Sequence, residues 1–365
     1  MSIFSHQEFN QHEQVSFFQC AETGLKAIIA VHNTNLGPAL GGCRMWAYEN
    51  DEQALRDVLR LSQGMTYKAA ITGLPLGGGK SVIIGDSKKI KTPDLMRGMG
   101  RAVEMFNGRY IVAEDVGTTV EDMNSIYSQT RHVVGISGGG DGNGDPSPTT
   151  ALGVYAGLKA AVRYRLRRDD VNGVKVAVQG LGNVGHNLCK MLAQDGAQLF
   201  VTDIQREKVE RAVKEFAAQG VDPEDIYSQD VEVFAPCALG AVLNDATIKI
   251  LKAKVVAGAA NNQLSEARHG DMLRNRKILY APDYLINAGG LINVYYEHMT
   301  RMTGKSYDRS KVVAHVQQIG ETAESIFRLA DQEGIATSAA ADRIAEQSFK
   351  STAANKAEYR RMSFE

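Results

Sequence analysis

Apolar residues in the first part of the chain follow two different spacings, which predict a mixture of strands and helices. Continuous apolar runs predict a strand at residues 25–32 and a short buried strand at residues 81–85. Residues 51–63 instead carry apolar side chains three and four positions apart, as one face of a helix does. Another helix is predicted to begin at Thr92, because a threonine N-cap followed by Pro93 favours a helix start.

From residue 174 onward the pattern alternates regularly between strands and helices. The predicted strands are residues 174–178, 198–203, 231–234, 254–258 and 279–282, and the predicted helices between them include residues 185–194 and 206–218. Such alternation is typical of a parallel, doubly wound sheet. The last stretch, residues 308–365, predicts long amphipathic helices, and its length suggests a helix that crosses back to the first domain.

A segment rich in glycine and proline separates the two patterns. Residues 135–148 contain six glycines and two prolines, a composition that excludes regular structure. The segment is either a plain linker or a hinge loop that also touches a ligand. A helix is predicted after it, at residues 149–163. We therefore expect an α/β protein of two domains: residues 1–136 together with about 334–365, mixed α/β, and residues 137–333, of the Rossmann type.

Composition narrows the classes of function. A length of 365 residues allows two domains, and a net charge of −1 offers no field that would attract nucleic acid or an anionic membrane. No apolar run reaches the roughly 18 residues that a membrane span needs, and the N-terminus does not resemble a signal peptide. The four cysteines are scattered without a CxxC pair, which argues against a zinc site or a disulfide framework and favours a reducing cytoplasm. We expect no metal.

The sequence Gly-Leu-Gly-Asn-Val-Gly at residues 180–185 predicts a dinucleotide site. The motif follows an apolar strand and opens a helix, with Asp203 at the end of the next strand, and this context gives it specificity. Gly180 would permit a tight turn, Gly182 the approach of a pyrophosphate, and Gly185 close packing of helix and strand. The Asp203 carboxylate would bind a ribose hydroxyl and repel a 2′-phosphate, which favours NAD over NADP, although the nearby Arg206 could offset that repulsion.

Two lysines lie 12 residues apart, at Lys68 and Lys80. A lysine on a helix surface is usually solvated, so Lys68 alone does not indicate function. Lys80 differs, because it follows three glycines and precedes an apolar run, and we expect it at the edge of a buried strand. Three glycines let a ligand or a second backbone approach closely. A lysine that is partly desolvated beside another cation gives up its proton more readily and can serve as a base.

Adjacent acids follow another predicted strand, residues 110–112. Glu114 and Asp115 stand in the sequence Ala-Glu-Asp-Val-Gly-Thr, and on their surroundings alone a surface turn is the simpler interpretation.

Eight segments spread over almost the whole chain resemble the glutamate/leucine/phenylalanine/valine dehydrogenase family. They are GPALGGCRM (37–45), GMTYK (64–68), GGGK (77–80), AEDVGT (113–118), PSPTT (146–150), GLGNVG (180–185), ANNQL (260–264) and APDYLINAGG (281–290). The resemblance implies reversible oxidative deamination of an L-amino acid to a 2-oxo acid and ammonia, in a cleft between a substrate-binding, oligomerising domain and the NAD-binding domain.

The resemblance also implies a role for each residue of the chemical centre. Lys68 would bind the substrate carboxylate. Lys80 would be the general base that activates water against the iminium intermediate, and Asp115 would carry protons to and from the substrate amine. The remaining cofactor contacts implied are Thr150, Asn183, Val184, Ile204, Ala260 and Asn261. Family members are commonly octamers, so we expect a homo-octamer that acts on a small-molecule amino acid.

The substrate pocket implied by the resemblance contains no charged residue. Its members would be Leu40, Gly41, Met65, Gly77, Gly78, Ala113, Asn262, Leu291 and Val294. An uncharged pocket disfavours glutamate, whose distal carboxylate would be buried without a partner. Branched-chain substrates (leucine, valine and isoleucine) are expected, and phenylalanine stays open because apolar pockets discriminate size by only about 1–3 kcal/mol. Leu291 is the position on which this choice depends most.

Two other functions are compatible with parts of the pattern. A non-catalytic NAD-sensing regulator could share the fold, but it would be expected to have lost Lys80 or Asp115, and both are present. An oxidoreductase for hydroxy acids would more naturally use a histidine–acid pair. No histidine of the sequence stands in such a motif.

Overall fold

The computed structural model describes residues 3–137 and 145–350, which form two compact units. Of the described residues, the first unit contains 3–137, 294–307 and 345–350, and the second contains 145–293 and 308–344. Among the described residues no helix has the length and apolar character that a bilayer crossing requires.

The boundaries of the units differ from the predicted domain boundaries. The prediction assigns residues 294–307 to the second domain and residues 334–344 to the first, and the structure groups both stretches the other way. The reason is that the chain passes between units inside two continuous helices, α10 (Gly289–Thr303) and α12 (Thr337–Lys350), where no glycine or proline marks the change. The assignment of substrate binding to one domain and cofactor binding to the other stays a prediction.

A mixed five-stranded sheet organises the first unit, with strand order β1-β2-β4-β3-β5. Its strands are β1 (Gln14–Cys20), β2 (Leu25–Asn33), β3 (Ala39–Trp46), β4 (Gly77–Ile84) and β5 (Tyr110–Glu114). The β1–β2 and β2–β4 pairs are antiparallel, whereas β3 runs parallel to both of its neighbours, β4 and β5. Strand β3 therefore lies between the strands that carry Lys80 and precede Asp115.

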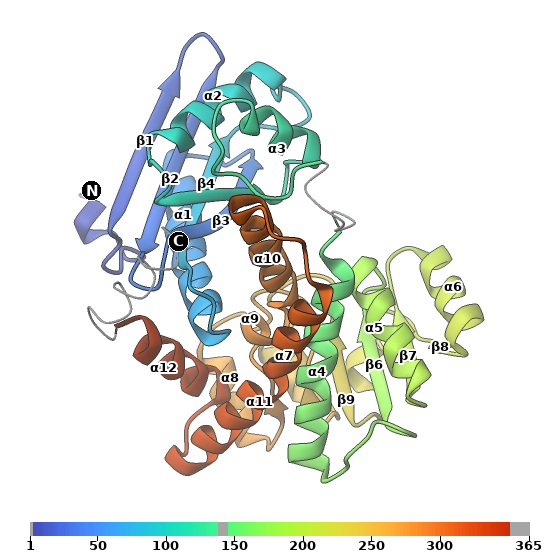
Figure 1. The fold of residues 1–365 in the computed structure, drawn as a ribbon. Helices are drawn as coiled ribbons and strands as arrows, with labels where there is room; N and C mark the ends of the chain where they lie inside the picture. Colours follow the sequence, from blue (N-terminus) through green and yellow to red (C-terminus); the bar gives the residue numbers. More distant parts are fainter. Residues whose placement is uncertain (1–2, 138–144, 351–365) are drawn as a thin grey trace. The chain divides into compact units, whose positions relative to one another are not determined.

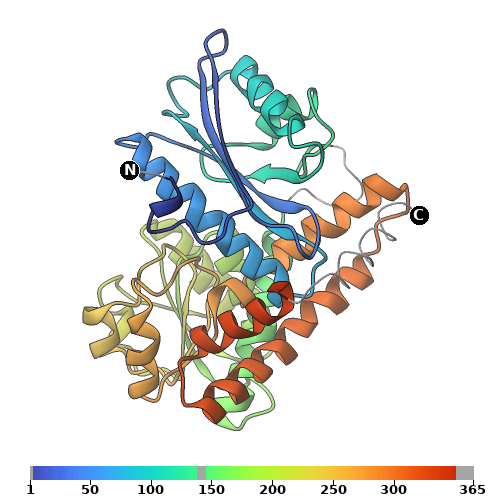
Figure 2. The same ribbon diagram turned by 90° about the vertical axis from the view of Figure 1, so that its left-hand side faces the viewer.

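Helices cover the two faces of this sheet (Figure 2). Helix α1 (Asp51–Ile71) packs Ala54, Val58 and Leu59 on Ile28, Ala30 and Val82. Helices α2 (Pro93–Glu104) and α3 (Val120–Tyr127) pack on the opposite face, where Cys43, Met45 and Ile83 point. Successive residues of each strand thus face α1 on one side of the sheet and α2 with α3 on the other. The predicted start of α2 is confirmed, since Thr92 accepts a hydrogen bond from the Leu95 amide and Pro93 is the first helical residue.

Helix α1 and strand β4 of this unit extend well beyond their predicted bounds, and β1, β3 and α3 were not predicted. Helix α1 continues to Ile71, because Thr66 and Tyr67 are also buried, and Lys68 consequently lies in its last turn. Strand β4 begins at Gly77 rather than residue 81, since β2 and β3 pair with the glycines on either side. Lys80 is therefore inside a strand and not at its edge.

The second unit contains a six-stranded parallel sheet with strand order β11-β10-β9-β6-β7-β8, which confirms the predicted doubly wound architecture. Figure 1 labels β9, β6, β7 and β8 of this sheet. Its strands are β6 (Lys175–Gln179), β7 (Gln198–Thr202), β8 (Gln219–Gly220), β9 (Val233–Pro236), β10 (Val255–Val256) and β11 (Leu279–Tyr280). Strand β8 was not predicted, because two exposed residues leave no apolar pattern. The sheet changes direction of winding between β6 and β9, the position where nucleotides bind in folds of this class.

The remaining helices belong to the second unit. They are α4 (Ser147–Leu166), α5 (Asn183–Gln194), α6 (Arg206–Phe216), α7 (Asp245–Ile250), α8 (Arg268–Asn275), α9 (Asp283–Ile286) and α11 (Arg309–Glu333). Short 3-10 turns lie at Ile3–Ser5 in the first unit and at Ile226–Ser228 in the second. Helices α11 and α12 confirm the predicted helical stretch as far as residue 350, and residues 351–365 lie outside the described part of the chain.

Candidate active site

Lys80 and Asp115 form a close ion pair in the first unit. Lys80 Nζ lies 2.7 Å from Asp115 Oδ2, although Lys80 is on β4 and Asp115 follows β5, with β3 between them. The lysine crosses β3 over Gly42. A Cβ at Gly42 would lie 2.7 Å from Asp115 Cβ and 3.1 Å from Lys80 Nζ, so a side chain at this position would occupy the space that the pair needs. Only 6% of Lys80 is exposed.

Hydrogen bonds hold the turn after β5 against β3, and they set the position of Asp115 in that turn. The Asp115 amide donates a hydrogen bond to Thr118 Oγ1 at 3.0 Å, and the Thr118 hydroxyl donates to the Cys43 carbonyl at 2.9 Å. Gly117 has φ +84°, and a Cβ there would lie 2.1 Å from the Met45 carbonyl oxygen. This turn therefore requires glycine at position 117.

Charges around Asp115 keep its carboxyl group ionised. Burial raises the pKa of Asp115, but the attraction of Lys80 and Arg44 outweighs burial and holds the pKa below its ordinary value. Arg44 Nε lies 3.1 Å from Asp115 Oδ2, the same oxygen that Lys80 contacts. The direct neighbour of Lys80 is thus an anion and not the cation expected beside it, and Arg44, which sequence reasoning did not select, contacts the same anion.

Several predicted pocket residues lie on the elements that surround this pair. Leu40 and Gly41 are on β3, Ala113 is on β5 opposite Gly42, and Met65 is on α1 with Lys68 one turn later. Leu40 lies on the same face of β3 as Gly42, because strand residues alternate between faces. Lys68 is half-buried.

The glycines before Lys80 pack against the protein itself. A Cβ at Gly77 would lie 2.0 Å from the Asn33 carbonyl oxygen, and one at Gly78 would lie 2.0 Å from the Thr66 amide nitrogen. The second of the two interpretations of this triplet, close approach of another backbone, is confirmed. Any contact of Gly77 or Gly78 with substrate must therefore use main-chain atoms.

Other predicted residues belong to the second unit or to α10. Leu291 and Val294 are half-buried on α10, and Thr150 is in the first turn of α4. Asn261 and Asn262 follow Ala260 in the loop after β10, and Asn262 has φ +52°. Buried Asn287 donates a hydrogen bond from Nδ2 to Asn261 Oδ1 at 2.7 Å, so it orients the Asn261 amide. Asn287 was missed as a site residue, although it stands in the APDYLINAGG segment.

The glycine turn before α5 has the geometry that a dinucleotide requires. Gly180 has φ +98°, and a Cβ at Gly185 would lie 2.0 Å from the Gly180 carbonyl oxygen, which confirms the predicted tight turn and close packing. Gly182 is exposed, has open space where a Cβ would be, and caps α5 without a side-chain hydrogen bond. The first turn of α5, with Asn183 and Val184, therefore offers free amide groups to a pyrophosphate.

Asp203 is held at the end of β7, beside this turn. Its Oδ2 accepts a hydrogen bond from the Leu181 amide at 2.7 Å, and its Oδ1 accepts one from the Gln205 amide at 2.9 Å. Ile204, next to it, is 92% exposed, an unusual position for so large an apolar side chain. Arg206 pairs with Glu210 of its own helix at 3.0 Å. These residues fit a dinucleotide.

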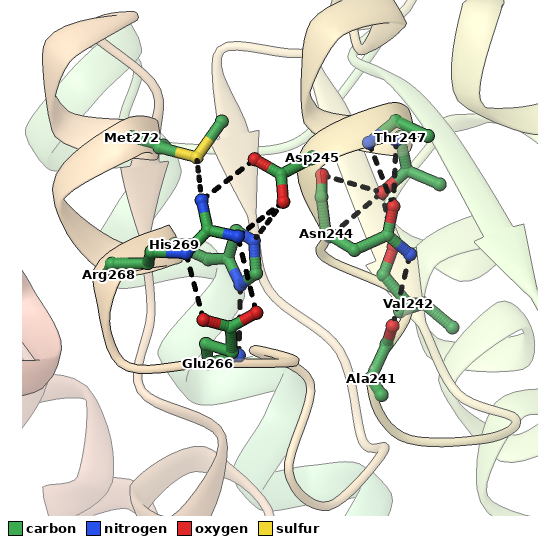
Figure 3. Close-up of polar contacts among 10 residues, drawn as sticks. Ala241, Val242, Asn244, Asp245, Thr247, Glu266, Arg268, His269 and Met272 are labelled. Carbon is green, nitrogen blue, oxygen red and sulfur yellow. Dashed lines mark hydrogen bonds and ion pairs between the residues drawn. The ribbon is translucent and has the colours of Figure 1, made fainter.

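Asp245, Glu266 and His269 bring possible metal-ligand atoms within 4.8 Å of one another in the described part of the second unit (Figure 3). Arg268 already lies among them, with Nη1 2.8 Å from Asp245 Oδ1 and Nε 2.9 Å from Glu266 Oε2. His269 Nδ1 accepts a hydrogen bond from the Glu266 amide, so the neutral ring carries its proton on Nε2 and has no lone pair there. The cluster is therefore an ionic contact that joins the starts of α7 and α8, and its hydrogen bonding disfavours a metal.

Comparison with known proteins identifies the family. A model of the Glu/Leu/Phe/Val dehydrogenase dimerisation domain matches residues 12–132, and one described as glutamate/leucine/phenylalanine/valine dehydrogenase matches residues 139–205 and 199–359. Leucine dehydrogenase of Bacillus subtilis is 53% identical over 95% of this chain and 94% of that protein. Phenylalanine dehydrogenase of Caldalkalibacillus thermarum is 46% identical over 95% of this chain and 94% of its own.

A solved structure agrees with these relatives in fold. The crystal structure of L-tryptophan dehydrogenase from Nostoc punctiforme has a TM-score of 0.82 and 48% identity, covering 93% of this chain and 96% of that chain. The predicted resemblance is thereby confirmed. The chain is an amino-acid dehydrogenase that uses a nicotinamide cofactor, and it belongs to the glutamate/leucine/phenylalanine/valine dehydrogenase family.

Proposed function

We propose that this protein catalyses the reversible, NAD-dependent oxidative deamination of branched-chain L-amino acids, leucine first among them. The observation that carries the proposal is the Lys80–Asp115 pair, which would supply a general base and a proton carrier 2.7 Å apart. The identity of 53% with a protein named leucine dehydrogenase supports the substrate.

The residues of the first unit would divide the chemistry between them. Lys68 would bind the substrate carboxylate as a point charge. Asp115, ionised and held by Lys80, would accept a proton from the substrate ammonium group, since only the free amine can release a hydride from Cα. The nicotinamide supplies the acceptor for that hydride. Lys80 would first release its own proton to solvent, and in its neutral form it would take a proton from the water that attacks the substrate iminium carbon. Asp115 would return the proton it holds to the product amine, which leaves as ammonia.

The choice of NAD over NADP rests on Asp203. Its carboxylate is fixed by two backbone amides, so it would accept a hydrogen bond from a ribose hydroxyl and repel a phosphate in the same place. Arg206 is exposed and paired with Glu210, so it is less available to bind a phosphate.

The substrate class rests on the predicted pocket. None of its members is charged, which disfavours glutamate, and Leu291 would limit the size of the side chain admitted. We further infer a homo-oligomer, because residues 12–132 match a dimerisation domain, and an octamer from the family resemblance. We infer a cytoplasmic place of action, because the cysteines are free.

The direct test is the stoichiometry of one reaction. L-leucine and NAD should yield NADH, ammonia and the 2-oxo acid in equal amounts, D-leucine should yield none, and NADP should replace NAD poorly. Reduction of the cofactor without release of ammonia would show a different oxidoreductase, and a preference for NADP would overturn the role of Asp203.

A further inference from the structure

Arg44 links the Lys80–Asp115 pair to a second carboxylate. Its Nε contacts Asp115 Oδ2 at 3.1 Å, and its Nη1 contacts Asp57 Oδ2 at 2.8 Å. Asp57 Oδ2 also accepts a hydrogen bond from the Tyr48 hydroxyl at 2.7 Å. Two cations and two carboxylates therefore alternate in one chain of contacts, from Lys80 through Asp115 and Arg44 to Asp57.

The fold of β3 and α1 produces this arrangement. Arg44 is two residues after Gly42 on β3, so it projects from the face over which Lys80 crosses to Asp115. Helix α1 packs on the same face and contributes Asp57, next to Val58 of its buried stripe. Tyr48 lies in the connection between β3 and α1. Two different nitrogens of Arg44 thus bind carboxylates from two different segments, Asp115 after β5 and Asp57 of α1. These two contacts restrict the orientation of the guanidinium group.

Partial burial makes these charges interact strongly. The side chains of Arg44, Asp57 and Asp115 are between 21% and 27% exposed. Burial opposes the charge of Arg44, but the attraction of Asp115 and Asp57 raises the pKa of Arg44 above its ordinary value. The guanidinium therefore stays charged whenever the enzyme works, and its field acts on Asp115 at contact distance.

We propose that Arg44 is a positioning residue that orients Asp115 for proton transfer and stabilises its ionised form, and that Asp57, with Tyr48, anchors Arg44 for this task. The inference rests on the proposed catalytic role of the Lys80–Asp115 pair. Asp115 must be ionised to accept a proton, so the acid limb of the pH profile of kcat/KM reports the protonation of Asp115.

Electrostatics predicts opposite effects for the removal of Arg44 and the removal of Asp57. Arg44→Gln removes a cation from beside Asp115, so protonation of Asp115 becomes easier and the acid limb should move to higher pH by about one unit. Asp57→Asn removes an anion that partly neutralises Arg44, so the acid limb should move to lower pH, by less than Arg44→Gln moves it. If the two substitutions only disturbed packing, they would not be expected to shift the acid limb in opposite directions.

The experiment measures kcat/KM against pH for both variants with the amino acid that the wild type turns over fastest. Arg44→Gln should also lower kcat by about 10- to 100-fold with a smaller change in KM, since a misplaced proton carrier slows chemistry. Arg44→Lys keeps the positive charge but cannot bind Asp57 and Asp115 through two separate nitrogens, so it should lower kcat without moving the acid limb. The matched control is Arg56→Gln, an exposed arginine on α1 paired with Glu8, which should leave the profile unchanged.

Two results would overturn the inference: an unshifted acid limb in both Arg44→Gln and Asp57→Asn, or shifts of the same sign. Melting temperatures show whether each variant is folded, and a folded variant with the wild-type profile counts against the proposal. Failure of the proposed function is separate, because it would appear as a wild type that does not release ammonia from branched-chain amino acids, whichever amino acid serves the pH profiles.

Discussion

Lys80 Nζ lies 2.7 Å from Asp115 Oδ2, although the strands that bring these residues together are not neighbours in the sheet. The contact exists because β3 has glycine at the crossing point, so the lysine passes over the strand without obstruction. The sheet therefore holds the two groups together as a pair. A substitution that disturbs the pair should lower activity more than it lowers stability.

Replacement of Lys80 by alanine should abolish nearly all turnover while binding of NAD persists. The variant loses the predicted base but leaves the glycine turn before α5 intact, in the other unit. Turnover is measured with leucine and NAD, and binding by calorimetry with NAD alone. Near-normal turnover in Lys80→Ala would remove the basis for its assignment as the base.

Gly42→Ala should lower kcat by about 100-fold or more, because the new methyl group would push Lys80 or Asp115 out of position. Gly64→Ala is the matched control. Gly64 is an exposed residue of α1 with open space around its Cβ position, so alanine there should keep activity and stabilise the protein by about 0.5–1 kcal/mol. Equal activity of both variants would contradict the crossing described here.

Asp203→Asn should weaken discrimination between NAD and NADP. The amide can still accept the Leu181 hydrogen bond, but it no longer repels a 2′-phosphate. We expect KM for NAD to rise by roughly 10- to 100-fold, the effect of losing one charge-assisted hydrogen bond, while kcat/KM with NADP improves. Glu224→Gln, an exposed carboxylate of the same unit, serves as the control and should change neither value. An unchanged ratio in Asp203→Asn would refute the role given to Asp203.

Stability of the first unit should fall in mild acid because of His32. Burial, and to a smaller degree the neighbouring His12, lowers the pKa of His32 from 6.5 to about 4. The folded state thus prefers the neutral ring, so the stability that this preference contributes is complete above pH 6.5 and is lost as the pH falls toward 4. The loss should reach about 2 kcal/mol by pH 5.

Urea unfolding of the wild type and of His32→Asn at pH 7 and pH 5 checks this expectation. The variant has no titrating group at this position, so its free energy of unfolding should fall less between the two pH values than that of the wild type. A difference between pH 7 and pH 5 that is the same in both proteins would show that His32 does not carry the effect.

Local patterns predicted the alternation of strands and helices in the second unit, but not β1, β3 or α3 of the first. The strand–helix alternation after residue 174 and the glycine turn at 180–185 are local signals, and the structure places both as predicted. The boundaries of the units could not be predicted in the same way, because they fall within α10 and α12, where helical periodicity continues unchanged.

The candidate site was less predictable, because its contacts depend on strand order. Nothing in the segments around Lys80 and Asp115 indicates that β3 lies between them, so Gly42 and Arg44 could not be linked to the pair. One signal was nevertheless available. In a strand, residues 40, 42 and 44 would lie on the same face, and Arg44 is the one charged residue in the otherwise uncharged run from 39 to 46. Asn287 gave no such signal, since its partner Asn261 is 26 residues away.

The most direct test of the proposed function is kcat/KM with NAD for leucine, isoleucine, valine, phenylalanine, tryptophan and glutamate, measured side by side at alkaline pH. The account predicts that the three branched-chain amino acids exceed the aromatic ones by about tenfold or more, the discrimination that an apolar pocket achieves, and that glutamate is not turned over. Phenylalanine or tryptophan at or above leucine, or measurable turnover of glutamate, would contradict it.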